Sequence, residues 1–519
     1  MNDKGRIENS IRNSFSGVFV QAASTIMGLV ARTFFIKYLS AEHLGVNGLF
    51  SNVLTMLSLA EMGIGGAITY SMYKPVADKD ELKIAQLMNL YRTAYRVVGT
   101  IIAILGICVI PFLDVIIKDR PNIDNLILIY LLFLGNTVAS YFFAHKKSVL
   151  SADQMERIVN YFALLYQLVR YVLQIITLIL WKNYIVYLLV QITCTFLDNF
   201  TVSMYVDKKY PFLKRYANVQ LDESEKKTIF DNIKALFIYK IGSTALDGTD
   251  NIIISAFDGV IKVGLLSNYS LLTGSLQTFI NKITQGLTGS VGNYIAREDK
   301  SSDREQLLEN ITFVHYILYG LLFVCGMAVL NPFVALWAGE KYLLSYDIVF
   351  VHCLNIYIYG MMNSIWMFRS TMGLFVYGRF RPLVSAVVNI IVSILLANRI
   401  GLLGVLLGTT ITRMITNVWF DPYIVYKHGL KKSPLIYYIK WACYLSVVIL
   451  NVMILHYIDG SLQLSGILAI ILYGLLSVVL FGISVSVIYG RSTSYIYMKK
   501  LCMSLFGKIG NRICLNGRR

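Results

Sequence analysis

Charged residues are scarce in this sequence. Asp, Glu, Lys and Arg together make up only 15% of the 519 residues, whereas hydrophobic residues make up 56% and the mean hydropathy is +0.60. A soluble globular domain carries about 25% charged residues. A soluble chain of this length would also divide into domains that are joined by polar linkers. The composition therefore predicts a membrane protein along the whole chain.

Motifs for metal, disulfide or nucleotide chemistry are lacking as well. The seven Cys and six His residues are dispersed, and none of them has the spacing of a zinc or redox site. There is no glycine-rich P-loop pattern. We therefore expect no metal, no cofactor and no direct use of ATP. The net charge of +17 is explained by membrane topology, so we do not expect nucleic acid as a partner.

Three basic residues, Lys4, Arg6 and Arg12, precede the first apolar segment. This arrangement is also found in signal peptides, but the apolar segment is too long for a signal core and lacks a small-residue cleavage site. The sequence therefore predicts a retained first transmembrane helix.

Apolar runs long enough to cross a bilayer recur along the chain. A spanning helix needs about 20 apolar residues, and the sequence predicts about fourteen such helices. The predicted spans are residues 14–38, 45–73, 89–117, 124–145, 158–181, 184–206, 229–257, 262–292, 310–338, 345–372, 380–398, 402–426, 438–458 and 464–489.

The positive charges agree with this topology. Of the 47 Lys and Arg residues, 33 lie on or beside the predicted inner segments, 7 on or beside the predicted outer loops, and the remaining 7 deeper within the spans. Because Lys and Arg favour cytoplasmic loops, both termini are predicted to be cytoplasmic. The longest outer loop, about residues 339–347, is too short for a catalytic domain. We therefore expect a transporter and not an enzyme.

A weak internal repeat predicts the overall architecture. Residues 45–51 (GVNGLFS) align with residues 264–270 (GLLSNYS) at an offset of 219, which places the second predicted helix on the eighth. This predicts an all-α integral membrane fold with two six-helix bundles, related by a pseudo-twofold axis around a central cavity, plus two C-terminal helices. The predicted divisions are a bundle at 1–206, a cytoplasmic linker at 207–228, a second bundle at 229–426, two helices at 427–489 and a basic tail at 490–519.

Polar and ionisable residues within the spans define a candidate substrate cavity. Each ionisable group costs about 2.5–3.5 kcal/mol on insertion scales, so such groups usually face a cavity or a partner. Cationic side chains suit an anionic group such as a diphosphate, and amide and hydroxyl side chains suit sugar hydroxyls. The candidate binding or gating residues are Gln21, Thr25, Arg32, Glu61, Lys240, Asp247, Asp250, Asn251, Asn281 and Lys282.

Internal charge pairing is the alternative for four of these candidates. Arg32 or Lys240 would then simply neutralise Asp247 or Asp250, and none of the four would contact a substrate. The sequence alone leaves both alternatives open.

Five other charged residues within spans have simpler predicted roles or none. We expect Arg170 and Asp198, at similar depth on neighbouring helices, to form a structural pair. Lys234 and Arg369 lie near cytoplasmic helix ends, where long side chains extend to the headgroups. Arg413 lies in the middle of a span and has no assignment.

Three segments of the sequence together resemble a known protein family. The first, residues 44–75, reads LGVNGLFSNVLTMLSLAEMGIGGAITYSMYKP. The second, residues 240–272, reads KIGSTALDGTDNIIISAFDGVIKVGLLSNYSLL. The third, residues 373–411, reads GLFVYGRFRPLVSAVVNIIVSILLANRIGLLGVLLGTTI. The three segments resemble, in the same order, the bacterial polysaccharide flippases of the multidrug/oligosaccharidyl-lipid/polysaccharide exporter (MOP) superfamily. None of them is a catalytic signature.

The resemblance implies a function and a location. It implies a flippase that moves undecaprenyl-diphosphate-linked oligosaccharide units across the bacterial inner membrane for O-antigen, capsule or exopolysaccharide synthesis. Transport would proceed by alternating access, coupled to a proton or sodium gradient or to the membrane potential. Implied partners are membrane lipids, a polysaccharide polymerase and other synthesis proteins. The alternatives are a multidrug cation antiporter, a peptidoglycan-precursor flippase and, outside this superfamily, a membrane enzyme of glycan synthesis.

The C-terminal tail and one pair of glycines can each be interpreted in two ways. The basic tail from Arg491 onward is either an amphipathic segment on anionic lipid or a disordered cytoplasmic end. Gly404 and Gly408 have a small-xxx-small spacing, which serves either close helix packing or hinge flexibility.

Overall fold

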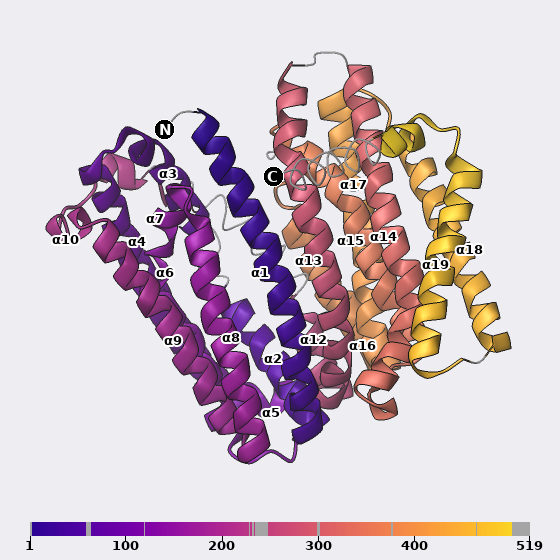
Figure 1. Cartoon of the computed structure of the whole chain (residues 1–519), viewed down its shortest axis with the longest axis horizontal. Helices are drawn as coiled ribbons and strands as arrows, with labels where there is room; N and C mark the ends of the chain where they lie inside the picture. The colour runs from indigo at the N-terminus through magenta and orange to yellow at the C-terminus, as the bar shows by residue number, and fades with distance from the viewer. Residues whose placement is uncertain are drawn as a thin grey trace, which may run out of the picture. The chain divides into compact units, whose positions relative to one another are not determined.

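The computed structural model is all-helical in the part of the chain that it describes (Figure 1). Apart from α-helices it contains short 3-10 and π-helical segments, and no β-strand occurs among the described residues. The structure describes residues 3–58, 64–118, 120–227, 229, 230, 233, 248–297, 301–374, 377–462 and 464–500.

The described chain forms two compact units. The first contains residues 1–268 and 380–405, and the second contains residues 269–379 and 406–519. The sequence-based division into bundles 1–206 and 229–426, with a linker, two further helices and a tail, stays a prediction.

The first unit contains the N-terminal helices together with parts of α13 and α16. Its helices are α1 (Asp3–Tyr38), α2 (Ala41–Leu57), α3 (Ile64–Asp78), α4 (Glu81–Val109), η2 (Ile110–Phe112), α5 (Leu113–Ile116), α6 (Leu126–Ala144), α7 (Lys147–Ala152), α8 (Glu156–Leu180), α9 (Tyr184–Lys209), α10 (Phe212–Arg215), α12 (Asp250–Asp258) and the first parts of α13 (Val260–Arg297) and α16 (Arg381–Arg413).

The second unit contains the remaining parts of α13 and α16 and the C-terminal helices. Its other helices are α14 (Ser301–Trp337), η3 (Glu340–Tyr342), α15 (Tyr346–Thr371), the π-helix η4 (Met414–Val418), α17 (Phe420–Ile424), the π-helix η5 (Val425–Leu430), α18 (Leu435–Leu462) and α19 (Gly466–Tyr489).

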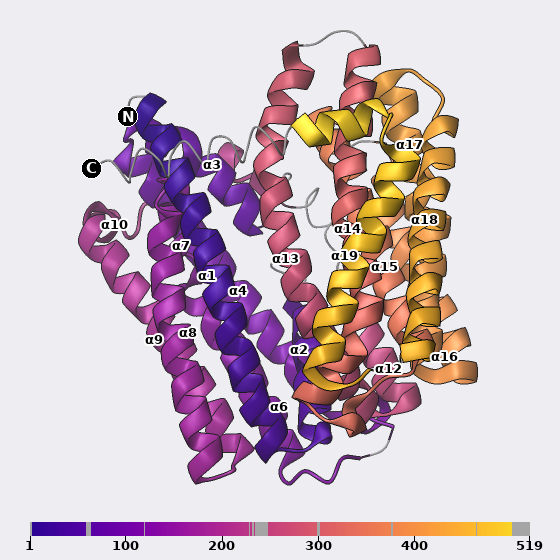
Figure 2. The ribbon, with the colours of Figure 1, turned by 45° about the vertical axis from the view of Figure 1, so that its right-hand side comes forward.

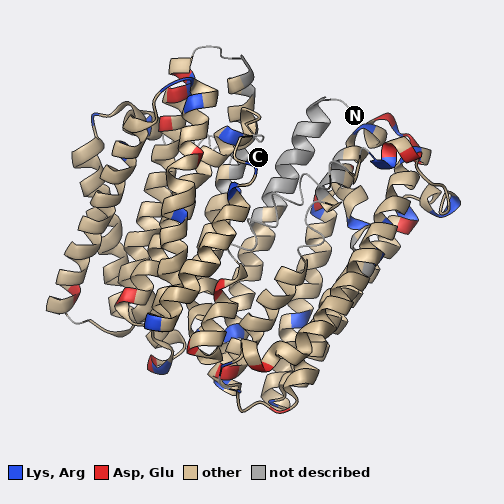
Figure 3. Cartoon of the chain, turned by 180° about the vertical axis from the view of Figure 1, so that it is seen from behind, with Lys and Arg blue, Asp and Glu red and all other residues tan. Residues whose placement is uncertain are grey.

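Long apolar helices make this chain a multi-pass membrane protein. Among the described residues, nine helices are long and apolar enough to span a membrane. Large apolar side chains point outward from them, for example Val487, which is 78% exposed. Charged residues gather toward the ends of the helices, and the stretches between carry few (Figure 3). The all-α membrane fold is therefore confirmed, whereas the count of fourteen spans and the pseudo-twofold symmetry stay predictions.

The predicted boundary between the spans 380–398 and 402–426 is confirmed. Ile400 and Gly401 have non-helical backbone angles within α16, and Gly401 has a φ of +55°. The Asp258 carboxylate accepts a hydrogen bond from the backbone N–H of Leu402 at 2.8 Å and so caps the second helical segment. At Gly404, a Cβ would lie 2.4 Å from the Leu396 carbonyl oxygen. Gly404 therefore serves close packing, as one of the two interpretations predicted.

Helix α4 holds part of the predicted linker, residues 216–220, in place. Three side chains spaced three residues apart, and so on one face of the helix, donate to main-chain carbonyls of residues 216–220. The bonds run from Gln86 to Gln220 O (3.0 Å), from Asn89 to Tyr216 O (2.8 Å) and Val219 O (3.0 Å), and from Arg92 to Ala217 O (2.8 Å). Lys83 adds an ion pair with Glu225. The linker therefore has a fixed path across α4.

The described part of the C-terminal tail is helical. Residues 493–500 form a helix that turns across the end of α19 (Figure 2). Tyr495 forms a hydrogen bond with Ser486 at 3.0 Å, and Thr493 accepts one from Gln306 at 3.2 Å. The rest of the tail, residues 501–519, lies outside the described residues, so neither of its two interpretations is tested there.

Candidate functional site

Arg32 of α1 is a predicted site residue that forms hydrogen bonds to another helix. Its Nε donates to the Asn268 side-chain oxygen at 3.1 Å, and its Nη2 donates to Ser267. Both acceptors lie on α13, within the first compact unit. The guanidinium also lies over the Phe35 ring, 5.9 Å from its centroid. A cation thus meets amide and hydroxyl groups inside the membrane-spanning part of the protein.

Asn268 offers a further donor beside Arg32. This residue is completely buried, and its Nδ2 has no hydrogen-bond partner among the described residues. A buried donor without a partner is costly, so such a group usually has a specific role. Together with Arg32, it could donate to an anionic or hydroxylated ligand.

Close helix packing brings α13 near the N-terminal helices. A Cβ on Gly45 of α2 would lie 1.9 Å from the Val260 carbonyl oxygen. A Cβ on Gly264 of α13 would lie 2.6 Å from the Ala41 oxygen and 2.9 Å from the Gly45 nitrogen. Only glycine fits at either position. Gly45 and Gly264 are two residues that the offset of 219 aligns, and the repeat itself stays a prediction.

The other α1 candidates face α8 or each other. Gln21 donates to Thr25 at 3.4 Å on the same helix. Between these two residues, Ser24 donates to Gln167 of α8 at 2.6 Å, and Gln167 donates to the Tyr171 hydroxyl at 3.1 Å. The predicted polar face of α1 therefore continues as a polar contact with α8.

The α12 candidates lie near the buried polar face of α16. Asp250 and Asn251 begin α12, and Thr249 before them donates to Asn389 of α16 at 3.3 Å. Asn389 is completely buried. Three further candidates, Glu61, Lys240 and Asp247, lie outside the described residues. The proposed pairing of Arg32 or Lys240 with Asp247 or Asp250 is therefore not tested.

The α13 candidates Asn281 and Lys282 lie in the second unit. The Asn281 oxygen accepts from the Tyr319 hydroxyl at 2.7 Å and from Asn363 at 3.0 Å. Lys282 is exposed and has no hydrogen bond among the described residues. The candidates that the structure describes are thus divided between the two units.

Two sequence-based predictions, one pairing and one side-chain direction, are wrong. Asp198 does not pair with Arg170, because it forms an ion pair with Lys147 at 2.8 Å. Arg369 does not extend to the headgroups, because it is only 5% exposed and pairs with Asp421 at 2.7 Å. In both cases the depth of the residue along its helix was predicted, but the direction of its side chain was not.

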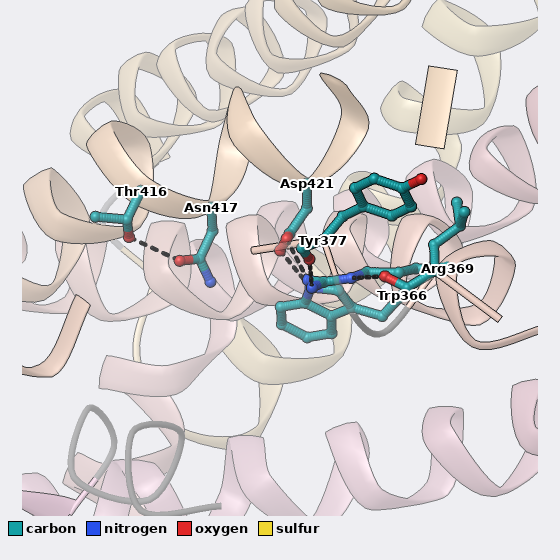
Figure 4. Close-up of polar contacts among 7 residues, drawn as sticks. Trp366, Arg369, Tyr377, Thr416, Asn417 and Asp421 are labelled. Atoms are coloured by element: carbon teal, nitrogen blue, oxygen red, sulfur yellow. Dashed lines mark hydrogen bonds and ion pairs between the residues drawn. The ribbon is translucent and has the colours of Figure 1, made fainter. Parts of the chain in front are cut away.

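Figure 4 shows the polar cluster around Arg369 in the second unit. Besides Asp421, Arg369 donates to the Tyr377 carbonyl oxygen, and Trp366 donates to the other Asp421 oxygen at 2.8 Å. The opposite charges neutralise each other, so this cluster fixes the loop after α15 and does not supply free charge for a substrate. Arg413, which had no assignment, donates to the Asn355 carbonyl oxygen at 2.9 Å.

The fold is that of MOP superfamily membrane transporters. The chain resembles the Lipid II flippase MurJ in an inward closed conformation, with a TM-score of 0.64, 16% identity and coverage of 92% of this chain and 99% of that one. It also resembles an inward-facing multidrug resistance MATE family transporter, with a TM-score of 0.56, 13% identity and coverage of 80% and 99%. It also resembles a MOP superfamily transporter from Pyrococcus furiosus, with a TM-score of 0.51, 13% identity and coverage of 82% of this chain and 96% of that one. Identities this low show the fold alone.

The sequence itself shows the family. The model of the polysaccharide biosynthesis proteins matches residues 10–287, which is more than half of the chain. The chain belongs to this family, and the resemblance found in its sequence segments is confirmed. No curated protein matches the chain.

Proposed function

We propose that this protein is a flippase for undecaprenyl-diphosphate-linked oligosaccharide units. It moves them by alternating access from the cytoplasmic to the outer leaflet of the bacterial inner membrane, for the synthesis of a surface polysaccharide. Both termini are cytoplasmic in this proposal. The protein is a secondary transporter, coupled to a proton or sodium gradient or to the membrane potential, and it works with a polysaccharide polymerase.

The Arg32 site is the observation that carries this proposal. An arginine suits a diphosphate because its planar guanidinium donates two parallel hydrogen bonds. The Nδ2 of Asn268 suits a phosphate oxygen or a sugar hydroxyl. The neighbouring Ser267 hydroxyl donates to the Gly264 carbonyl oxygen at 2.7 Å, so it suits a sugar hydroxyl only as an acceptor. Membership of the polysaccharide biosynthesis family supports a substrate of this class.

The first experiment locates the lipid-linked intermediate in a deletion strain. Leaflet accessibility of the oligosaccharide and the amount of surface glycan are measured together. We expect intermediates confined to the inner leaflet, loss of surface glycan, and restoration of both by the wild-type gene. If intermediates instead reach the outer leaflet and fail only to polymerise, the protein is not the flippase.

Variants of Arg32 then test the site. A charge-assisted hydrogen bond contributes about 1.5–3 kcal/mol, so Arg32→Gln should lower surface glycan about tenfold to a hundredfold at equal protein level. Arg32→Lys keeps the charge but not the two parallel bonds, and should retain part of the export. Lys37→Gln is the matched control, because Lys37 lies at the exposed end of the same helix. Normal export by Arg32→Gln would contradict the assignment.

The alternatives make different predictions in the same strain. A multidrug cation antiporter would change drug sensitivity and leave surface glycan intact; a cation in α1 at the Arg32 position disfavours a cationic substrate. A peptidoglycan-precursor flippase would be essential for viability, so a viable deletion strain with reduced surface glycan excludes it as the main role.

A further inference from the structure

Arg170 lies in the middle of the membrane-spanning helix α8 and has no polar partner among the residues that the structure describes. Its side chain forms no hydrogen bond and no ion pair within the described residues, and its Nε is buried. Its contact is with the Tyr171 ring, whose centroid lies 5.0 Å from the guanidinium carbon. An unpaired charge at this depth is costly, so it usually faces a water-filled space or a ligand.

The side of α8 that carries Arg170 is polar and faces other helices. Gln167, Arg170, Tyr171 and Gln174 lie on one side of the helix by their spacing. The opposite side is apolar and exposed, as expected for contact with lipid; it includes Leu165, Val169, Val172 and Ile176. Arg170 therefore does not belong to the lipid-facing surface.

The polar side of α8 is continuous with the Arg32 site. Gln167 and Tyr171 meet α1 at Ser24 and Gly28, where a Cβ on Gly28 would lie 3.2 Å from the Tyr171 hydroxyl. Tyr187 of α9 lies close enough to both arginines for each guanidinium to interact electrostatically with its side chain. Phe35, which contacts Arg32, also packs edge-on against the Tyr187 ring at 5.3 Å.

We infer that Arg170, with Gln167 and Tyr171, forms a second anion-binding position in the first compact unit, beside Arg32. It takes a phosphate group of the lipid-linked substrate, with the guanidinium as the charged donor and the tyrosine and glutamine as neutral hydrogen-bond partners. This inference rests on the proposed function. It assigns the arginine that the sequence analysis had placed in a structural pair to substrate recognition.

The inference predicts a particular combination of effects on stability and binding. An arginine that supports the fold lowers the melting temperature when it is removed. An arginine that pairs only with a bound anion destabilises the ligand-free protein. Its removal therefore leaves the melting temperature unchanged or raises it, while ligand binding is lost.

The test uses the full-length protein in nanodiscs of phosphatidylcholine, with undecaprenyl diphosphate as the probe. Melting temperature and dissociation constant are measured for the wild type, Arg170→Gln and Arg170→Lys. We expect Arg170→Gln to melt no lower than the wild type and to bind the probe at least tenfold more weakly, with Arg170→Lys between the two. Arg413→Gln is the control, because Arg413 donates to the Asn355 carbonyl; it should melt lower and bind normally.

Four outcomes would overturn the inference or its basis. A lower melting temperature with unchanged probe affinity for Arg170→Gln assigns Arg170 to the fold. Addition of phosphatidylglycerol distinguishes the source of the anion. The site belongs to a membrane phospholipid if both proteins bind the probe with equal affinity and phosphatidylglycerol competes with the probe only in the wild type, not in Arg170→Gln. If Arg32→Gln weakens binding and Arg170→Gln does not, only the second position fails. If the wild type does not bind the probe, the proposed function fails.

Discussion

Arg369 of α15 and Asp421 of α17 form an ion pair of 2.7 Å in which the Asp421 side chain is completely buried. Arg369 also donates to two main-chain carbonyls, those of Leu374 and Tyr377, in the loop that leads to α16. A buried charge pair gains its stability from complete hydrogen bonding, and loss of one partner leaves the other charge buried and unpaired. This pair therefore couples the end of α15 to the π-helical region at 414–430.

We expect Asp421→Asn to destabilise the protein by about 3–5 kcal/mol, because it leaves Arg369 without a counter-charge. Trp366→Phe removes one hydrogen bond to the same carboxylate and should cost about 1–2 kcal/mol. Thermal unfolding of the purified protein measures both. Glu223→Gln is the control, because the Glu223–Lys226 pair is exposed and contributes at most about 1 kcal/mol. An effect of Asp421→Asn no larger than that of the control would contradict the role of the pair.

Substitution of either glycine where α2 and α13 meet should disturb the packing. Gly45→Ala places a methyl group 1.9 Å from a main-chain oxygen, which cannot move without a backbone shift. We expect a loss of about 1–3 kcal/mol or more, seen as a lower melting temperature and a lower membrane yield. Gly274→Ala on α13 is the matched control, since a Cβ there meets open space and alanine favours the helix by about 1 kcal/mol. Equal stability of the two variants would show that α2 and α13 do not approach this closely.

Asn268→Asp should inactivate the Arg32 site without harming the fold. The new carboxylate lies at the position that already accepts a hydrogen bond from the Arg32 Nε at 3.1 Å, so the two charges neutralise each other. We expect surface glycan to fall about tenfold or more while the melting temperature stays equal or rises. Ser267→Ala removes one neutral acceptor and should have a smaller effect on export. If Asn268→Asp exports normally, the positive charge of Arg32 is not needed for transport.

The linker bonds on α4 can be tested by hydrogen exchange. Asn89→Ala removes two hydrogen bonds to the linker, each worth about 1 kcal/mol. Main-chain exchange in residues 216–220 should therefore become about tenfold faster or more, with little change elsewhere. Thr93→Ala on the same helix removes only a bond to the α4 main chain and serves as the control. Unchanged exchange in Asn89→Ala would show that the linker is held by other contacts.

The sequence was sufficient to predict the positions of most helices. The span predicted at 158–181 matches α8, that at 184–206 lies within α9, and the break between 398 and 402 falls at Ile400 and Gly401. These features depend on local properties, since about 20 apolar residues are needed to cross the bilayer and a residue with positive φ favours glycine. Local properties can be read from one sequence.

The polar contacts could not be predicted in the same way. Arg369 and Asp421 are 52 positions apart, and Arg32 and Asn268 are 236 positions apart, so each contact depends on how the helices rotate about their axes. Asp198 illustrates the limit. Its depth suggested Arg170 as a partner, but the long side chain of Lys147, at the start of α7, reaches it instead. Side chains of Lys and Arg extend far from their own backbone, so depth alone does not identify their partners.

The three α4 side chains that hold the linker recognise its main chain and not its side chains. Gln86, Asn89 and Arg92 each donate to carbonyl oxygens, which every amino acid provides. The identity of the residues at 216–220 is therefore free to vary as long as the number of residues and their backbone path are kept. For protein engineering, this segment is a place where the sequence can be rewritten, for example to introduce an epitope or a spectroscopic label, without removing what anchors it.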